Sequence, residues 1–498
     1  MNEKVLLIYT AYYKIQNPLN GVAPPYGLAW IAQSLKEKNI ICEICDLSLI
    51  KNKNELYSKL TNSVKHFNPD AIGVSIRNIT TGVEPAKSFL PYLKIIIQHI
   101  RSITNIPLIA GGAGFSLYPQ DCMEQLDIDY GIIGEGEKAF PQLLETIFLK
   151  KNPDAIPNVV YKKNSRIIIN KYESISEKDF AVPDHSLIDY DAYDRIGGYF
   201  PIQTKRGCQF ACIYCTYPYL ERKTYRFRSP KDIVKEISHL KNNFSMEHFF
   251  FTDSVFSYPR DYCISVLQEI IKHKINISWS AYINPKDVTE ELIKLFKASG
   301  CSSVEVTIDT ASLQTLKAYN KNFSLQEMYL LDTYLYKYEI PALYWVNLGG
   351  PGETRLTLQE NLKNLSQLKS VSKGWVGKGF IVLPGSPLYE IALKENKIKK
   401  ASLNDFYQYV SDDLPPDFAE EIQKFCFQNP MWYSRFDRIY PGYMEMVSNI
   451  MNNKIRNHYL LQHEYGLKRL ELYKQNKIKI YSQKEFDSQL KELHQGEA

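Results

Sequence analysis

Short apolar runs alternate with amphipathic stretches along the first 150 residues. Five runs have the length of buried strands and lie at 5–9, 40–45, 71–76, 107–110 and 129–133. Helical periodicity separates them, for example from Pro24 to Lys38, where proline suits the first turn of a helix. Strands that alternate with helices predict a doubly wound, Rossmann-like parallel sheet over residues 1–150. Ligands of such sheets bind beyond the carboxyl ends of the strands.

Glycine and polar residues gather at these predicted strand ends. They are Ser75, Arg77 and Asn78 after the third strand, Gly111 and Gly112 after the fourth, and Gly134, Glu135, Gly136 and Glu137 after the fifth. Glycine lets the backbone approach a ligand closely. The pattern therefore predicts a ligand site at this edge, and the alternative is a flavodoxin-like domain whose glycines only make turns.

A second series of strands and helices follows a polar segment. Residues 151–195 carry scattered Pro and Asp and are typical of a linker, with one hairpin at 159–161 and 167–169. Over 196–400 six strands are predicted, at 199–204, 248–252, 277–282, 304–308, 343–348 and 379–383. Six βα units predict a partial barrel with its active site at the C-terminal strand ends. Residues 401–498 are predicted to be a helical, aromatic-rich region that covers the substrate or packs on the barrel.

The length, charge and composition of the chain limit the classes of function that it can have. The 498 residues suggest two or three domains, and the net charge of +5 is not concentrated in any Lys/Arg block, so nucleic-acid binding is not indicated. No run of 18 apolar residues and no signal peptide is found, so no membrane span is predicted. Nine cysteines without framework spacing fit a reducing cytoplasm.

Three of these cysteines lie within eight residues. Cys208, Cys212 and Cys215 have the spacing C-x3-C-x2-C. Thiolates are the preferred ligands of iron–sulfur clusters, and three ligands leave one iron of a four-iron cluster open. Structural zinc needs four ligands, and three close cysteines cannot all form disulfides. The triplet therefore predicts a cluster whose open iron can bind a substrate.

The triplet resembles the signature of the radical S-adenosylmethionine (SAM) enzymes, C-x3-C-x-aromatic-C, with Tyr214 at the aromatic position. The resemblance implies a [4Fe–4S] cluster that chelates SAM and cleaves it reductively. The glycine-bearing strand ends upstream resemble the cobalamin-binding domain of the cobalamin-dependent radical SAM enzymes. Cobalamin is therefore the third expected cofactor, beside the cluster and SAM.

The cobalamin motif D-x-H-x-x-G is altered in this chain. After Asp46, Ser48 replaces the cobalt-binding histidine and Lys51 replaces the glycine, and His66 is expected to be a surface residue. The segment Ser75-Ile-Arg77-Asn78 resembles the S-x-R-N of a branch that includes a tryptophan C-methyltransferase and phosphinate P-methyltransferases. The resemblance implies a catalytic role for Arg77 under the cobalt, because a guanidinium offers a metal no lone pair.

Polar residues at the barrel strand ends are candidates for SAM binding. They are Asp253 for the ammonium group, Glu305 or Asp309 for the ribose, and Gly350 and Glu353 in a glycine-rich turn that resembles the adenine-binding turn of the family. The alternatives are a helix cap for Asp253 and a helix-dipole contact for Glu353. Arg226 and Arg228 either pair with carboxylates or lie on the surface.

The resemblance implies a methyltransferase that moves a methyl group from cobalamin to an unactivated carbon, or to phosphorus, of a small molecule. A flavodoxin or ferredoxin is the expected electron donor. The alternatives are a cobalamin-dependent rearrangement or cyclisation without methyl transfer, and a non-catalytic cobalamin or redox sensor. The methylthiotransferases are disfavoured, because the first 150 residues lack their additional cluster cysteines.

Overall fold

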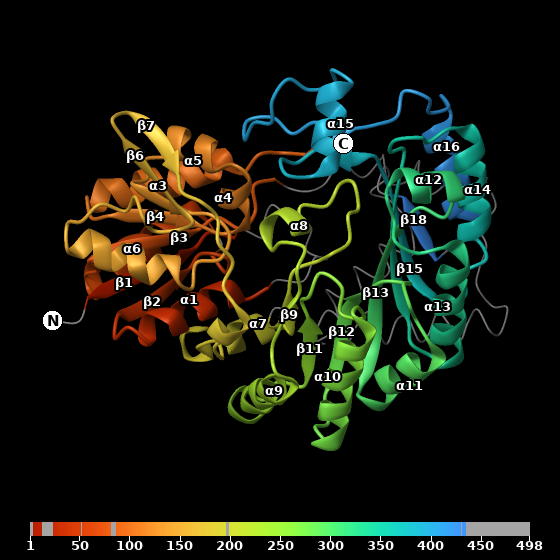
Figure 1. Cartoon of the computed structure of the whole chain (residues 1–498), viewed down its shortest axis with the longest axis horizontal. Helices are drawn as coiled ribbons and strands as arrows, with labels where there is room; N and C mark the ends of the chain where they lie inside the picture. Colours follow the sequence, from red (N-terminus) through yellow and green to blue (C-terminus); the bar gives the residue numbers. More distant parts are fainter. Residues whose placement is uncertain are drawn as a thin grey trace.

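The computed structural model describes residues 3–11, 23–50, 52–80, 86–195, 199–429 and 431–434. It contains two seven-stranded sheets with helices packed around them, which lie side by side in Figure 1. This arrangement confirms the predicted α/β class with a doubly wound sheet and a partial barrel. Among the described residues no helix is long and apolar enough to cross a membrane.

The elements of the first sheet and its helices are β1 (Lys4–Tyr9), α1 (Tyr26–Lys36), β2 (Ile41–Asp46), α2 (Lys53–Phe67), β3 (Ala71–Ser75), α3 (Leu90–Ile103), β4 (Leu108–Gly111), α4 (Ala113–Leu117), α5 (Pro119–Gln125), β5 (Tyr130–Ile132), α6 (Ala139–Phe148), β6 (Val159–Lys163) and β7 (Arg166–Ile169). The strand order is β2-β1-β3-β4-β5-β6-β7. Strands β1 to β5 are parallel, and the predicted hairpin β6–β7 extends the sheet in antiparallel fashion.

Helices cover both faces of this sheet. In β1, Leu6 and Ile8 pack in the core on one face, while Val5 and Leu7 pack in the core on the other. Continuous burial on both faces explains the unbroken apolar sequence of the strand. The chain leaves β1 toward β2 on one side and returns to β3 on the other, so the strand order reverses between β1 and β3. In open α/β sheets this switch point is where ligands bind.

The second sheet and its helices contain α7 (Tyr190–Arg195), β8 (Phe200–Ile202), β9 (Lys205–Arg206), α8 (Tyr217–Leu220), β10 (Arg226–Phe227), α9 (Pro230–Phe244), β11 (His248–Phe251), α10 (Arg260–Lys272), β12 (Ser278–Ile283), α11 (Glu290–Ala298), β13 (Cys301–Asp309), α12 (Leu313–Ala318), α13 (Leu325–Lys337), β14 (Ala342–Leu348), α14 (Arg355–Leu365) and β15 (Val371–Lys378). The strand order is β18-β15-β14-β13-β12-β11-β8, and all neighbours are parallel.

The predicted position of the last barrel strand is wrong. The sixth barrel strand is β15, not 379–383, and within that range only β16 (Phe380–Ile381) is a strand, paired antiparallel with β17 (Gln408–Tyr409). Strand β15 contains two glycines and three polar residues, so its sequence lacks the apolar pattern that predicts a strand. Gly374 is required there, because a Cβ at that position would lie 2.2 Å from the ring of Trp432. Trp432 belongs to β18 (Trp432–Ser434), a seventh strand that was not predicted.

The C-terminal segment returns to the first sheet before it reaches β18. Leu403 and Phe406 pack in the core of the first sheet, although they lie beyond the barrel in sequence. The described part also contains α15 (Pro387–Lys394) and α16 (Phe418–Gln428). The helical and aromatic pattern predicted beyond residue 434 lies outside the described residues.

Candidate functional site

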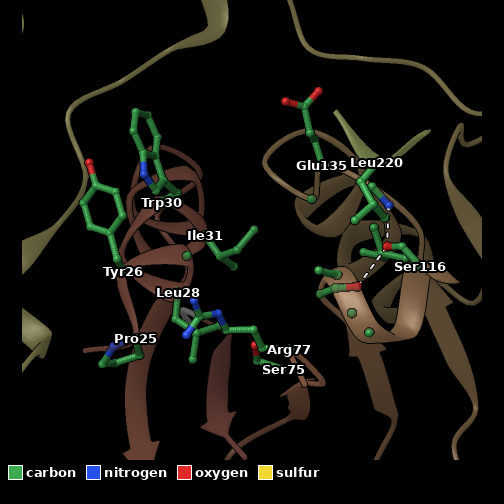
Figure 2. Close-up of a pocket in the computed structure, with 18 of the residues that line it drawn as sticks. Pro25, Tyr26, Leu28, Trp30, Ile31, Ser75, Arg77, Ser116, Glu135 and Leu220 are labelled. Atoms are coloured by element: carbon green, nitrogen blue, oxygen red, sulfur yellow. Dashed lines mark hydrogen bonds between the residues drawn. The ribbon is translucent and has the colours of Figure 1, made fainter. Parts of the chain in front are cut away.

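A cavity of about 560 Å³ opens at the carboxyl edge of the first sheet, at the switch point between β1 and β3. Its floor is formed by strand ends and by Arg77, and helix α1 supplies one wall (Figure 2). Residues of the barrel and of α8 close it from the other side, including Tyr199, Tyr217 and Leu220. Figure 1 shows α8 between the two sheets, so both halves of the chain contribute to this cavity.

The predicted glycines shape the cavity. Gly112 and Gly134 have positive φ angles of 100° and 69°, which favour glycine. A Cβ at Gly112 would lie 2.7 Å from the carbonyl oxygen of Ile76. Ser116, which the sequence did not single out, joins the two turns: its Oγ donates to the Gly112 carbonyl at 2.8 Å and accepts from the Gly134 N–H at 2.8 Å (Figure 2).

The S-x-R-N segment lies at the base of the cavity. The carbonyl of Ser75 accepts a hydrogen bond of 2.7 Å from Thr10, which ties the end of β3 to the end of β1. The side chain of Arg77 extends across the base toward helix α1 in Figure 2. The structure thus brings together Ser75, Arg77 and the glycines at 111, 112, 134 and 136, as their strand-end positions predicted.

No histidine is found among the described residues that line the cavity. Ser48, which replaces the motif histidine, is buried, and its hydroxyl bonds with Asp46 at 2.7 Å and with Tyr193 at 2.7 Å. His66 is exposed on α2, where its Nδ1 contacts the Asn62 carbonyl. The cavity therefore suits a large ligand that approaches glycine backbone and apolar walls, and its fit to cobalamin does not depend on an imidazole ligand.

The cysteine triplet lies in the segment 207–225, which joins β9 to β10. Cys208 is buried, and Cys212 and Cys215 are half-buried. Burial raises the pKa of Cys215 to about 12, and the neighbouring Cys212 and Cys208 thiols also raise it, so the three thiols are close enough to interact. Within the described ranges no group of three side chains is already arranged to hold a metal ion. The donor set, three thiols on one segment, fits a cluster with one open iron.

Tyr214 of the signature anchors this segment to the barrel. Its hydroxyl donates to Asp309 at 2.5 Å, and its ring stacks on Phe380 with a centroid distance of 4.8 Å. Lys321 completes the contact through an ion pair of 2.7 Å with Asp309, and both side chains are almost fully buried. Asp309 is thus engaged in a structural ion pair, and Lys321 had no signal in the sequence because it lies in a loop.

Two of the predicted SAM-binding carboxylates are bonded within the protein. Asp253 accepts from the Thr204 and Lys205 N–H groups at 2.7 and 3.1 Å and pairs with the Lys205 ammonium at 3.2 Å. Glu353 accepts from the Gly349 N–H at 3.0 Å and from Thr357 at 2.6 Å. Both carboxylates are fully buried, so they organise the ends of β8 and β14. A direct contact of either one with SAM stays a prediction.

The other two SAM candidates lie in different settings. The N–H of Gly350 donates to the Tyr319 hydroxyl at 2.8 Å, within the glycine-rich turn. Glu305 is on the side of β13 opposite to the helix-facing core, and it accepts from the indole of Trp345 at 2.7 Å. None of the five SAM candidates is among the residues that line the cavity of the first sheet.

Removal of the Asp253 carboxylate should destabilise the barrel strongly. Asp253→Ala leaves the buried Lys205 ammonium without its anion, and an orphaned buried charge of this kind costs about 3–5 kcal/mol. The free energy of unfolding, measured by urea denaturation of the cofactor-free chain, should fall by that amount. The exposed Asp232 serves as the control, because Asp232→Ala should change it by less than about 0.5 kcal/mol. Similar losses in the two variants would contradict this account.

Arginines beside the cysteine segment pair with buried carboxylates. Glu135 accepts from Arg206 at 2.9 Å and from Arg226 at 2.5 Å, and Arg228 pairs with Glu236 at 2.6 Å. Of the two alternatives for Arg226 and Arg228, the structure therefore supports carboxylate pairing. In Figure 2 the Glu135 side chain extends away from the strand ends that carry Ser75 and Arg77. Its carboxylate pairs with Arg206 and Arg226.

Two family models match the chain. The B12 binding domain matches residues 16–144, and the Radical SAM superfamily matches residues 202–365. An uncharacterized methyltransferase of Pyrococcus horikoshii is 24% identical over 77% of this chain and 81% of its own length. The anaerobic magnesium-protoporphyrin IX monomethyl ester cyclase of Rubrivivax gelatinosus is 23% identical over 83% of this chain and 74% of its own length.

A solved structure shares the whole fold. The radical S-adenosylmethionine methyltransferase TsrM of Kitasatospora setae, with cobalamin and a [4Fe–4S] cluster bound, has a TM-score of 0.79 at 19% identity. The match covers 95% of this chain and 100% of that one. Both family models, in the expected order, cover the cavity and the cysteine segment described above. With both domains present, the chain belongs to the cobalamin-dependent radical SAM enzymes, and its cofactors are a [4Fe–4S] cluster, SAM and cobalamin.

Proposed function

We propose that this enzyme transfers a methyl group, carried by cobalamin, to an unactivated carbon or to phosphorus of a small molecule. One observation carries the proposal: the segment with the three cysteines also supplies a wall of the cavity at the switch point of the first sheet. A cluster ligated by Cys208, Cys212 and Cys215 would adjoin a cobalamin in that cavity. Cobalamin supplies the methyl carrier, and the chain holds the two cofactor sites together and limits the access of water.

The proposal also includes an electron donor, the SAM contacts and a role for Arg77. A flavodoxin or ferredoxin in the cytoplasm would supply electrons, since reductive cleavage of SAM requires a donor. Asp253, Glu305, Gly350 and Glu353 stay the proposed SAM contacts, and each also has a hydrogen-bond partner within the protein. Arg77 would lie under the corrin and keep its cobalt without a lower ligand.

The test uses the full chain, reconstituted anaerobically with iron, sulfide and cobalamin. With SAM labelled in its methyl group and a small-molecule extract as acceptor, we expect S-adenosylhomocysteine and a labelled product heavier by one methylene. Heat-denatured enzyme is the control. A product of changed structure without added label would contradict methyl transfer and indicate a rearrangement or cyclisation. SAM turnover that stays at the level of the denatured control would exclude an enzymatic role.

The cobalt should lack a nitrogen ligand from the protein. This expectation follows because Ser48 is buried against Asp46 and Tyr193, and because no described residue that lines the cavity is a histidine. Electron paramagnetic resonance of the Co(II) form should show no nitrogen superhyperfine splitting. The free cofactor with its own base coordinated is the positive control. A clear nitrogen coupling in the enzyme would overturn this prediction.

The guanidinium of Arg77 should keep water from the lower face of cobalt and so sustain the rate of methyl transfer. Arg77→Ala should admit water to the lower face of cobalt, and Arg77→Lys should restore the wild-type state only in part, because an ammonium is a mobile point charge that can lose its proton. The expected result is retained cobalamin, an altered Co(II) spectrum and slower methyl transfer. Wild-type spectra and turnover in both variants would make Arg77 an ordinary strand-end residue.

A further inference from the structure

The cysteine segment closes a two-stranded ribbon with two arginines at its base. Strands β9 and β10 are antiparallel, and Arg206 lies directly opposite Arg226. Both side chains are more than nine-tenths buried. Like charges at opposite positions destabilise a strand pair, and a buried charge must be paired. The ribbon that carries the cluster ligands therefore needs anions from outside itself.

The turn after β5 supplies these anions. Glu135 divides its carboxylate between the two arginines: Oε1 lies 2.9 Å from Nη1 of Arg206, and Oε2 lies 2.5 Å from Nη1 of Arg226. Glu137 from the same turn contacts Nη2 of Arg206 at 2.6 Å. Gln203 accepts from Nε of Arg206 at 2.9 Å, so every nitrogen of this guanidinium is used. Only a planar guanidinium, whose N–H donors point in fixed directions, can bond with all three acceptors at once.

The same turn and the same segment also border the cavity. All four residues of the turn 134–137 and Arg206 line the cavity, and Tyr217 and Leu220 of α8 line it from the cysteine segment. The middle of the segment is held separately, through the hydrogen bond from Tyr214 to Asp309 of the barrel. A shift of the ribbon base would therefore move Cys208, two residues beyond Arg206, relative to the anchored middle of the segment and to the cavity.

We propose that Glu135 and Arg206 are positioning residues: their ion pair fixes the cysteine segment against the cavity and so sets the cluster with its SAM in reach of cobalamin. This inference rests on the proposed function, because methyl transfer is the reaction for which the cluster and cobalamin would be positioned. The ion pair itself is a property of this chain and can be tested without cofactors.

The first experiment measures backbone hydrogen exchange in the cofactor-free chain. We compare the wild type with Glu135→Gln and Arg206→Lys, since an ammonium cannot bridge both carboxylates. Glu173→Gln, which alters an exposed carboxylate of the adjoining linker, is the matched control. Amides of residues 207–225 should exchange roughly tenfold faster in the two test variants, while β12 and β13 exchange as in the wild type. The control should match the wild type throughout.

The second experiment uses the reconstituted enzyme. Bound iron and the KM for SAM should stay close to wild type, whereas kcat for methyl transfer at saturating cobalamin should fall about 100-fold, as expected of misplaced reactants. Uniformly faster exchange in both sheets would overturn the proposal in favour of a general stabilising role. Unchanged exchange in 207–225, or faster exchange with unchanged kcat, would overturn it too. A wild type that transfers no methyl group refutes the proposed function, and the exchange comparison still tests the ion pair.

Discussion

Replacement of Cys208, Cys212 and Cys215 by alanine should abolish iron binding and SAM cleavage together. The anaerobically reconstituted wild type should hold about four irons and absorb broadly near 400 nm, as thiolate-ligated clusters do. The triple variant should lose both signals, because it removes all three thiols of the C-x3-C-x2-C segment, which is the donor set that fits the cluster. Iron analysis and the yield of 5′-deoxyadenosine provide the measurement.

The chain offers a matched control for this loss. Cys263, Cys301 and Cys122 are buried thiols in the hydrophobic cores, away from the cysteine segment. Their conservative replacement by serine or alanine should lower stability without loss of the cluster. Retained iron and retained SAM cleavage in the 208/212/215 variant would contradict the ligand assignment.

The sequence predicted the central strands of the first sheet well because β1, β3 and β4 are buried on both faces. A strand such as β1 reads as an unbroken apolar run, and polar residues appear only where the strand ends. The site residues at these ends, Ser75, Arg77 and the glycines, could therefore be assigned to one edge of the sheet from the sequence alone. Ser116 was missed, because a serine near the end of a short helix can have many roles.

The barrel was less predictable where glycine and polar residues enter its strands. Strand β15 carries Gly374 to make room for Trp432, a residue from β18 that is distant in sequence. Similarly, Asp253 and Glu353 lie at strand ends as expected of ligand-binding residues, yet their oxygens are bonded to nearby backbone and side-chain groups. A sequence indicates where a carboxylate falls along a strand, but which donor reaches it depends on tertiary contacts. The ion pair of Glu135 with Arg206 joins residues that are 71 positions apart.

Filling the cavity at Gly111 should block cobalamin without unfolding the chain. Gly111 ends β4 without the positive φ that favours glycine, and a Cβ there would meet only the Ile132 carbonyl, at 3.7 Å. Larger side chains in Gly111→Val and Gly111→Phe would extend into the space that the corrin needs. Overlap of this kind costs about 1–3 kcal/mol, which corresponds to a roughly 5- to 150-fold loss of affinity. Equilibrium titration with cobalamin should show a larger loss for Gly111→Phe than for Gly111→Val.

Gly73 in the neighbouring β3 also lines the cavity, but it provides a contrast in stability because core side chains lie close to its Cα. A Cβ at Gly73 would lie 2.9 Å from Leu7 and 3.0 Å from Phe140. Gly73→Val should therefore lower the thermal unfolding temperature of the cofactor-free chain, whereas Gly111→Val should leave it close to wild type. The assignment of the cavity to cobalamin requires this separation of effects. If Gly111→Phe bound cobalamin as tightly as the wild type, the ligand would lie elsewhere.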